Sequence, residues 1–526
     1  MIVRRWIARA SAICLALLGA CTAAPATGAR ANVQTGAGAI EGVIAGGVRA
    51  YLGIPFAAPP VGDLRWRPPQ PVAPWEGAKR ATSFAPACLQ TGVSMPGEAP
   101  PRVSEDCLYL NVWAPEASAA TKLPVIVWIH GGGWTNGATA MPLYSGARLA
   151  RRGVVFVSVA YRLGPLGFLA HPGLSAEGGG ASGNYGLMDQ IAALRWVQAN
   201  IAAFGGDPQR VTIAGQSAGG MSVSLLMASP QTQGLFTRAI GQSGGVFEPL
   251  QLAPNYQLAQ AEKDGVAYAV SVGANSLREL RALPGETLLG AKAGSISHPV
   301  IEPRTLPLSP YEAYIAKRWR DVPVLVGSNA QEGNSLANLA PVTAANFEVE
   351  LKKSWGDLPP PLTQAYPYAS DEQAKAARSS FERDLRFGWD MWAWARLQAK
   401  LGAKPAFYYR FDQSPPFPAG SERRGWGPAH FAELWYMFDQ LDQEDWAWTD
   451  TDRTLADTMA RYWVNFASTG DPNGPDLPAW PAFGSNGEVL VLGETIRARQ
   501  APVDPQLRVF DAVYDGVRGS AFAEPG

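Results

Sequence analysis

A short glycine-framed motif, Gly-Gln-Ser-Ala-Gly at residues 215–219, constrains this chain more than any other stretch of its sequence. An apolar run at 211–214 leads into the motif, and a helical pattern at 221–227 follows it. The segment therefore predicts a strand, a sharp turn and a helix. The flanking glycines let the backbone bend tightly enough to lift the Ser217 hydroxyl above the end of a sheet, which is the geometry of a serine nucleophile.

A second copy of the pattern, Gly-Gln-Ser-Gly-Gly at residues 241–245, competes with the first in a chain that has 56 glycines. Pro249 follows Ser243 closely, and a proline that early argues against a helix behind the serine. The expected strand, turn and helix therefore favour Ser217 over Ser243 as the nucleophile.

The first twenty residues have the order of a secretory signal. Three arginines among the first ten residues precede an apolar run at 12–18, and small residues follow that run. The run is too short to remain as a membrane-spanning helix. We therefore expect an exported protein.

The end of this segment, Leu-Gly-Ala-Cys at 18–21, resembles the lipobox of bacterial lipoproteins. We expect residues 1–20 to be removed as a lipoprotein-type signal peptide, Cys21 to carry the lipid, and residues 21–32 to form a flexible tether. Ordinary cleavage after Ala31, with Cys21 discarded, is the alternative. The first reading predicts a periplasmic or outer-membrane-tethered protein in a bacterium, which meets the membrane only through its anchor, and the second predicts secretion.

Charge and cysteine content narrow the classes of partner. The 44 basic and 45 acidic residues are mixed along the chain, so no basic stripe indicates nucleic acid. Outside the signal segment only Cys88 and Cys107 remain, and in an exported chain we expect them to pair, closing a loop worth about 3 kcal/mol. Two buried free thiols are the alternative. The four histidines are scattered, so we expect no metal site and no other cofactor.

Strand patterns alternate with helical ones along the rest of the chain, which predicts an α/β fold. A helical pattern at 189–203 lies between two strand patterns, so the sheet is expected to be parallel and doubly wound. We expect a single body over residues 33–520, with helical insertions near 250–320 and 334–400 that roof the sheet. The strand patterns lie at 123–129, 154–161, 211–214, 239–241, 322–326 and 406–411.

Two histidines follow Ser217 in the chain and are the candidates for its base. His430 lies in a loop after the strand at 406–411, whereas His298 precedes a proline in a polar stretch and is expected at the surface. Glu332 follows the strand at 322–326 and is the candidate for the orienting acid, since sites in such sheets assemble beyond the carboxyl ends of strands. An exposed loop carboxylate is the alternative for Glu332.

The motif His-Gly-Gly-Gly-Trp at 130–134 directly follows the strand at 123–129. Glycines there let backbone N–H groups approach a substrate oxygen without obstruction by side chains. We expect the amides of Gly132, Gly133 and Ala218 to form an oxyanion hole. A phosphate-binding loop is the competing interpretation, but no Gly-Lys-Ser or Gly-Lys-Thr follows.

Further motifs extend through most of the chain after the signal, and together with the features above they resemble the type B carboxylesterases. This family of α/β-hydrolases includes bacterial esterases, cholinesterases and the non-enzymatic neuroligins. The resemblance implies a central, mostly parallel sheet flanked by helices with large helical insertions. The motifs include Tyr-Leu-Gly-Ile-Pro at 51–55, Glu-Asp-Cys-Leu at 105–108, Gly-Asn-Tyr-Gly at 183–186, Phe-Gly-Gly-Asp-Pro at 204–208 and Thr-Gly-Asp-Pro at 469–472.

The resemblance also assigns roles to individual residues. It implies Ser217, Glu332 and His430 as a catalytic triad, and it gives Ser243 a supporting hydrogen bond near the triad acid. The remaining implied pairs are structural: a disulfide between Cys88 and Cys107, and ion pairs of Arg65 with Glu105 and of Arg162 with Asp189.

Two departures from the cholinesterase pattern bear on the substrate. Gln216 stands where cholinesterases have a glutamate before the nucleophile, and residues 89–106 contain no tryptophan. A choline ester is therefore disfavoured, and we expect a neutral ester, with bulky or aromatic esters as a weaker expectation. The candidates for the pocket are Trp134, Gln216, Trp426 and Phe431, where Phe431 replaces the usual small residue after the histidine; Trp389 and Trp392 are weaker candidates, since aromatic residues at helical spacing are more often core.

The sequence thus predicts a serine carboxylesterase that hydrolyses a small-molecule ester through an acyl-enzyme intermediate. One alternative is a catalytically silent adhesion or binding protein of the same fold. Another is a hydrolase of amides, lactones or polymer-bound esters. The sequence carries no signal for an oligomeric state.

Overall fold

The protein is described here from a computed structural model, which covers residues 29–93, 95, 99–117, 121–290, 293–484 and 486–518. The expected signal peptide at 1–20, Cys21 and the first part of the expected tether lie outside these residues. The tether was expected to reach residue 32, but β1 (Ala29–Thr35) pairs with β2 (Gly38–Ala45) from its first residue. Residues 29–32 of the expected tether therefore belong to the sheet.

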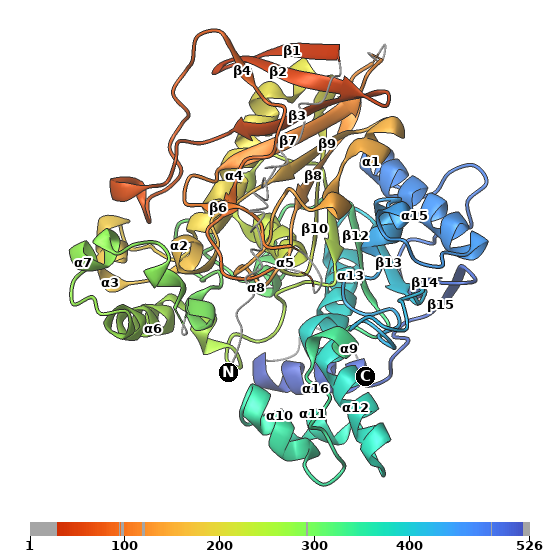
Figure 1. The fold of residues 1–526 in the computed structure, drawn as a ribbon. Helices are drawn as coiled ribbons and strands as arrows, with labels where there is room; N and C mark the ends of the chain where they lie inside the picture. Colours follow the sequence, from red (N-terminus) through yellow and green to blue (C-terminus); the bar gives the residue numbers. More distant parts are fainter. Residues whose placement is uncertain are drawn as a thin grey trace, which may run out of the picture.

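One large sheet forms the centre of the molecule, in the order β1-β2-β3-β7-β9-β8-β10-β11-β12-β13-β14-β15, with β4 beside β2 (Figure 1). The strands from β9 to β14 are parallel, and both ends of the sheet are antiparallel. This confirms the expected mostly parallel sheet. The other strands of this sheet are β3 (Val48–Pro55), β4 (Ala78–Arg80), β7 (Tyr109–Pro115), β8 (Leu123–Ile129), β9 (Val155–Val159), β10 (Gly206–Gln216), β11 (Arg238–Gln242), β12 (Val324–Asn329), β13 (Ala406–Phe411), β14 (Glu488–Leu492) and β15 (Arg497–Gln500). A separate two-stranded sheet pairs β5 (Ala87–Cys88) with β6 (Val103–Ser104).

Helices cover both faces of this sheet, so the parallel strands are apolar on both sides. In β8, for example, every residue after Leu123 is buried. One face packs against α4 (Tyr185–Asn200), α5 (Ala218–Ala228) and α13 (Trp389–Leu401). The other face packs against α1 (Ala147–Arg151), α14 (Leu434–Met437) and α15 (Asp450–Thr469). The side chains of the two layers form the two largest hydrophobic clusters.

Two mostly helical stretches extend the body beyond the sheet (Figure 1). The first contains α6 (Leu258–Ser271), α7 (Leu277–Ala282) and α8 (Pro310–Ile315). The second contains α9 (Gly333–Leu336), α10 (Phe347–Trp355), α11 (Pro360–Gln364), α12 (Asp371–Arg383) and the π-turn η8 (Asp384–Gly388), which runs directly into α13. The other helices are α2 (Gly164–Phe168), α3 (Pro172–Glu177) and α16 (Leu507–Arg518). Among the described residues, no helix combines the length and the apolar character needed to cross a membrane.

Candidate active site

Ser217 occupies the sharp turn between β10 and α5, as the sequence predicts. Its backbone has φ 58° and ψ −130°, a strained conformation for a residue with a side chain. The turn needs glycine on both sides. A Cβ on Gly215 would lie 2.4 Å from the carbonyl carbon of Gly219, and a Cβ on Gly219 would lie 2.0 Å from the Ile129 oxygen. The serine side chain thus stands at the end of the central strand, beside the N-terminus of α5.

The structure brings His430 and Glu332 into direct contact. His430 Nδ1 lies 2.5 Å from Glu332 Oε2, and the two side chains are 1% and 0% exposed. With its proton on Nδ1, the imidazole donates this hydrogen bond and keeps Nε2 free of that proton. The other carboxylate oxygen, Oε1, accepts a 2.7 Å hydrogen bond from the backbone N–H of Asn329. Glu332 is therefore a buried, oriented partner of the histidine and not an exposed loop carboxylate.

Two aromatic rings flank the His430 imidazole. The Phe387 ring stacks on it with centroids 4.7 Å apart and planes within 2°. The Phe431 ring lies at 4.2 Å and 56°, and Phe431 has a φ of 74°. Phe431, a pocket candidate from the sequence, thus lies directly against the proposed base. Phe387 enters from the turn η8, which no sequence motif marks.

A second buried carboxyl group lies next to Glu332. Glu433 accepts hydrogen bonds from Asn329 Nδ2 at 2.6 Å and from Gln242 Nε2 at 3.2 Å. Burial, together with the charge of Glu332, raises the pKa of Glu433 to about 8. Glu433 therefore holds a proton at neutral pH. Asn329 bridges the two groups, with its backbone on Glu332 and its side chain on Glu433.

The expected oxyanion amides lie at the same cavity as Ser217 and His430. Gly132, Gly133 and Ala218 all line it. Gly132 and Gly133 have φ values of 104° and 62°, which glycine adopts without strain. The Gly132 carbonyl is turned away into the loop, where it accepts the N–H groups of residues 135 and 136, so the loop is a closed turn. Ala218 is the first residue of α5, and its N–H belongs to the unpaired N-terminal set of that helix.

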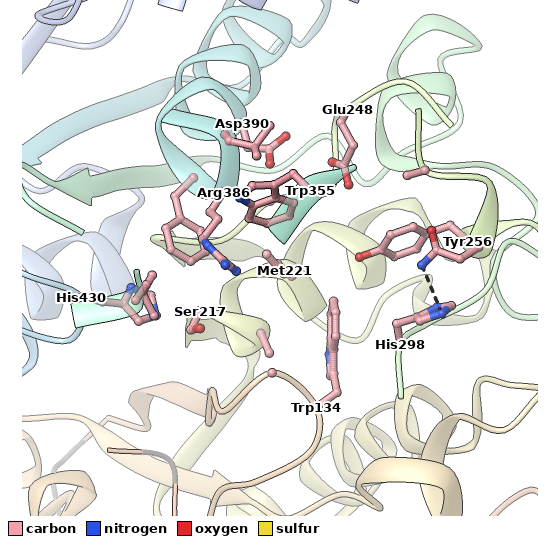
Figure 2. Close-up of a pocket in the computed structure, with 18 of the residues that line it drawn as sticks. Trp134, Ser217, Met221, Glu248, Tyr256, His298, Trp355, Arg386, Asp390 and His430 are labelled. Atoms are coloured by element: carbon pink, nitrogen blue, oxygen red, sulfur yellow. Dashed lines mark hydrogen bonds between the residues drawn. The ribbon is translucent and has the colours of Figure 1, made fainter. Parts of the chain in front are cut away.

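This cavity has a volume of about 750 Å³ and opens between the sheet and the two helical stretches (Figure 2). Figure 2 shows Ser217 and His430 on one side, Trp134 below, Tyr256 with His298 on the opposite side, and Asp390 with Glu248 at the top. Apolar and aromatic groups make up much of the wall. They include Trp134, Met221, Leu252, Tyr256, Trp355, Leu358, Leu362, Leu385, Phe387, Phe431 and Tyr514.

Of the four residues that the sequence suggested for the pocket, two line the cavity and two do not. Trp134 and Phe431 line the cavity. Gln216 does not line it; this residue is fully buried, with Nε2 3.4 Å from both ring nitrogens of His430. Trp426 also lies outside the lining, because its ring packs against Phe417.

The structure also decides where Trp389, Trp392 and His298 lie. Trp389 and Trp392 are core residues of α13, with 1% and 4% exposure, and they do not line the cavity. His298 was expected at the surface, but it lines the cavity across from His430, with Nε2 3.2 Å from Asn255 Nδ2. The chain after α6 folds back over the site, which the polar sequence around His298 does not reveal.

Ser243 is fully buried at the end of β11, with a φ of 46°. Its N–H donates to the Gly327 carbonyl at 2.8 Å, but its hydroxyl has no hydrogen-bond partner among the described residues. The expected hydrogen bond near the triad acid is therefore not formed. The loop that begins at Ser243 instead supports the turn at Ser217, because a Cβ on Gly244 would lie 2.1 Å from the Ser217 carbonyl oxygen.

The predicted structural pairs are confirmed. Cys88 and Cys107 form a disulfide, which excludes the alternative of free thiols. Arg65 and Arg162 form two-point ion pairs with Glu105 and Asp189, and the Arg162 pair is buried. Such pairs hold loops around the site. None of the four residues is among those that line the cavity.

Several residues of the cavity wall carry no recognisable sequence signal. Arg386 and Phe387 come from η8, Trp355 from α10, and Tyr256 from the short 3-10 helix η5 (Pro254–Tyr256) before α6. These residues lie in the helical insertions. The element η8 is a π-turn, and such turns often mark a functional region of a helix. No motif precedes or follows them, so only the three-dimensional arrangement shows that they face Ser217.

Comparison with known proteins gives a consistent result. The chain matches the Carboxylesterase family over residues 29–510. It is 38% identical to fumonisin B1 esterase of Sphingopyxis macrogoltabida, with 93% of each chain covered, and 35% identical to para-nitrobenzyl esterase of Bacillus subtilis (strain 168), with 89% of this chain and 96% of the relative covered. A solved structure of a thermophilic PNB esterase matches with a TM-score of 0.79 and 33% identity, over 91% of this chain and 99% of that chain.

Proposed function

This chain belongs to the carboxylesterase family and is a serine carboxylic ester hydrolase, and we propose that Ser217, His430 and Glu332 carry its reaction. The observation that carries the proposal is the buried 2.5 Å contact between His430 and Glu332, at a cavity that Ser217 also lines. Nucleophile, base and acid follow one another in the chain order of this fold.

The proposed reaction begins with attack of the Ser217 oxygen on the ester carbonyl carbon. His430 takes the hydroxyl proton, and Glu332 stabilises the imidazolium that forms. The oxygen of the tetrahedral intermediate accepts hydrogen bonds from the amides of Gly132, Gly133 and Ala218, at the loop and helix end where such donors are free.

The intermediate then collapses to an acyl-enzyme. The ester C–O bond breaks, and His430 returns its proton to the departing alcohol. Water enters the cavity, gives a proton to the same histidine and attacks the acyl carbonyl carbon. Release of Ser217 with that proton completes the cycle and yields the carboxylic acid.

We propose that the substrates include neutral esters with a bulky or aromatic part and exclude choline esters. The volume of about 750 Å³ and the aromatic wall support a bulky group. The name of one relative, para-nitrobenzyl esterase, also supports an aromatic group in the ester. A panel of natural esters graded by the size of the acyl and alcohol parts tests this choice.

Hydrolysis of p-nitrophenyl acetate and butyrate tests the proposed residues. Wild type is expected to hydrolyse both, and Ser217→Ala is expected to lose the activity while keeping its circular dichroism spectrum and Tm. Equal rates for the two proteins, or no hydrolysis by wild type, would contradict the proposal. The second outcome would favour a binding protein or a hydrolase of amides, lactones or polymer-bound esters.

We further propose that the protein is exported and held to a membrane through a lipid on Cys21. The lipobox at 18–21 and the Cys88–Cys107 disulfide support export, because disulfides persist in oxidising compartments. Metabolic labelling with palmitate tests the anchor: label should enter wild type and be absent from Cys21→Ser. Label in both proteins, or in neither, would contradict it.

A further inference from the structure

Arg386 is the only lysine or arginine among the described residues that line the cavity of the proposed active site. It lies in η8, one residue before Phe387, whose ring stacks on His430. Figure 2 shows its guanidinium projecting from the wall toward the side where Ser217 and Met221 lie. The Arg386 side chain is 35% exposed, so its head meets the solvent of the cavity.

The partners of Arg386 leave its positive charge uncompensated. Arg386 Nε lies 2.8 Å from Glu382 Oε2, but Arg378 also pairs with the same carboxylate, with Nη2 2.6 Å from Oε1. One negative charge therefore faces two guanidinium groups. Trp355 Nε1 donates a further 2.8 Å hydrogen bond to Glu382 Oε1. Among the described residues, neither Nη group of Arg386 has a hydrogen-bond partner, and these are the outer atoms of the side chain.

The carboxyl groups elsewhere in the cavity do not supply the missing negative charge. Burial raises the pKa of Glu248, and burial together with the Glu248 carboxylate raises the pKa of Asp390 well above its ordinary value. These shifts disfavour the charged form of each carboxyl group, and Arg518 lies beside the pair as a separate cation. Asp357, at the rim, pairs with Lys352 Nζ at 2.6 Å.

The guanidinium head is also held in place. The Trp355 ring lies 4.5 Å from the Arg386 Cζ, a cation–π contact, and the hydrogen bond to Glu382 holds Nε. A planar cation that is fixed in advance loses little freedom when it binds a carboxylate, and its two Nη groups match the two carboxylate oxygens.

We propose that Arg386 binds a carboxylate of the substrate, so that esters carrying a free carboxylate are preferred over neutral esters of the same size. The proposal rests on the ester hydrolysis at Ser217 proposed above and names a more specific substrate class for that site. Arg386 acts as a specificity residue that holds a non-reacting part of the ester. Neutral esters remain substrates, because the aromatic wall receives them without this contact.

Two matched ester pairs test the proposal by kcat/KM. Monomethyl and dimethyl adipate, counted per ester group, carry the charge on the acyl side, and 4-carboxyphenyl and 4-carbamoylphenyl butyrate carry it on the alcohol side. Wild type is expected to prefer the anionic member of at least one pair. In Arg386→Gln the kcat/KM of that member should fall about ten-fold, the order of one charge-assisted hydrogen bond at a partly exposed site, while that of its neutral partner changes less than about two-fold. Arg386→Lys should keep part of the preference.

Lys353→Gln is the matched control, because it removes an exposed positive charge from α10, in the same helical stretch, at a residue that pairs with Glu350 and lies outside the cavity lining. It should leave the ratio of anionic to neutral rates unchanged, with Tm recorded for every variant. Hydrolysis of the neutral esters with no anionic preference in either pair, or an equal ratio in wild type and Arg386→Gln, would overturn the role of Arg386 and leave the ester hydrolase intact. Failure to hydrolyse any of the four esters, or equal rates for wild type and Ser217→Ala, would overturn both proposals.

Discussion

The Phe387 ring lies face to face with the His430 imidazole, with centroids 4.7 Å apart and planes inclined by 2°. The stacking holds the imidazole in the plane in which Nδ1 meets Glu332. It also places the negative face of a phenyl ring against a group that becomes a cation during the proposed reaction. The turn η8 thus supplies both an orienting ring for the histidine and, at the preceding residue, the proposed carboxylate contact.

Replacement of Phe387 by leucine should therefore lower kcat by about three- to ten-fold, the range expected for loss of an aromatic pair worth about 0.5–1.5 kcal/mol. KM for a small neutral ester should change less, since the ester carbonyl does not depend on this ring for binding. Steady-state kinetics with p-nitrophenyl butyrate measures both constants. Phe387→Tyr is the control and should keep kcat near the wild-type value. An unchanged kcat in Phe387→Leu would exclude the orienting role.

Replacement of Glu332 by glutamine should keep the shape of the site and remove its charge. The new amide can still accept the Asn329 N–H, but it can no longer stabilise an imidazolium at Nδ1. We expect kcat to fall by roughly two to four orders of magnitude, as for the loss of a triad acid, with a small change in Tm. Rates near wild type for Glu332→Gln would show that Glu332 only supports the loop.

Glu433→Gln is the matched comparison for Glu332→Gln, because Glu433 is equally buried and shares Asn329 as a partner. Glu433 already holds a proton at neutral pH, so a neutral amide resembles its resident state. The variant should retain most of the wild-type kcat at pH 7. Equal losses in the two variants would mean that both act through the structure of the loop and not through charge.

The pKa of Glu433 also predicts a pH dependence of stability. Its ordinary value is 4.5, and burial with the charge of Glu332 raises it to about 8 in the folded protein. Between these values the folded state binds a proton that the unfolded chain has lost. The free energy of unfolding therefore contains a Glu433 contribution that is complete below about pH 4.5 and is lost as the pH rises through about 8.

Thermal unfolding of wild type and Glu433→Gln from pH 5 to pH 9 measures this contribution. The Tm of wild type should fall more steeply toward pH 8 than that of the variant, because only wild type must ionise the buried Glu433 carboxyl group. Glu248 and Asp390 contribute with the same sign in both proteins, so the difference between the two curves isolates Glu433. Parallel curves would contradict the raised pKa.

The parts of the site that the sequence predicted well are those fixed by local backbone geometry. The turn at Ser217 and the loop at Gly132 and Gly133 require glycines at set positions beside apolar strands, and such patterns are visible in one dimension. The contact of His430 with Glu332 follows from parallel strands that end at the same edge of the sheet. The predicted strands match the parallel centre of the sheet, whereas the strands β7, β14 and β15 were not predicted.

The cavity wall was predicted poorly, because its residues come from insertions whose path depends on packing. Tryptophans illustrate the difficulty. Trp134 and Trp355 face the cavity, whereas Trp426 packs against Phe417, and their sequence surroundings do not separate these cases. A polar surrounding likewise suggested an exposed His298, although the chain folds it back over the site. Whether an aromatic or polar side chain faces a cavity is decided by contacts between distant segments.

Replacement of Gly219 by alanine tests the geometry of the nucleophile turn itself. The added Cβ would lie 2.0 Å from the Ile129 oxygen and 2.9 Å from the His130 oxygen, so backbone must move. That backbone leads directly into the Gly132 loop, and the shift should displace the oxyanion amides along with Ser217. We expect destabilisation by about 3 kcal/mol or more, and a kcat in the remaining folded protein at least about 100-fold below wild type.

Gly516→Ala is the control for Gly219→Ala. Gly516 lies in α16, where an added Cβ would meet no atom within 4 Å, and alanine is favoured over glycine inside a helix by about 0.5–1 kcal/mol. This variant should keep wild-type kinetics and unfold at the same or a slightly higher temperature. Chemical denaturation and p-nitrophenyl butyrate kinetics compare the two variants. A Gly219→Ala protein with the stability and kcat of Gly516→Ala would mean that the turn at Ser217 can accept a side chain at this position. The requirement for glycine after the serine would then have no steric basis.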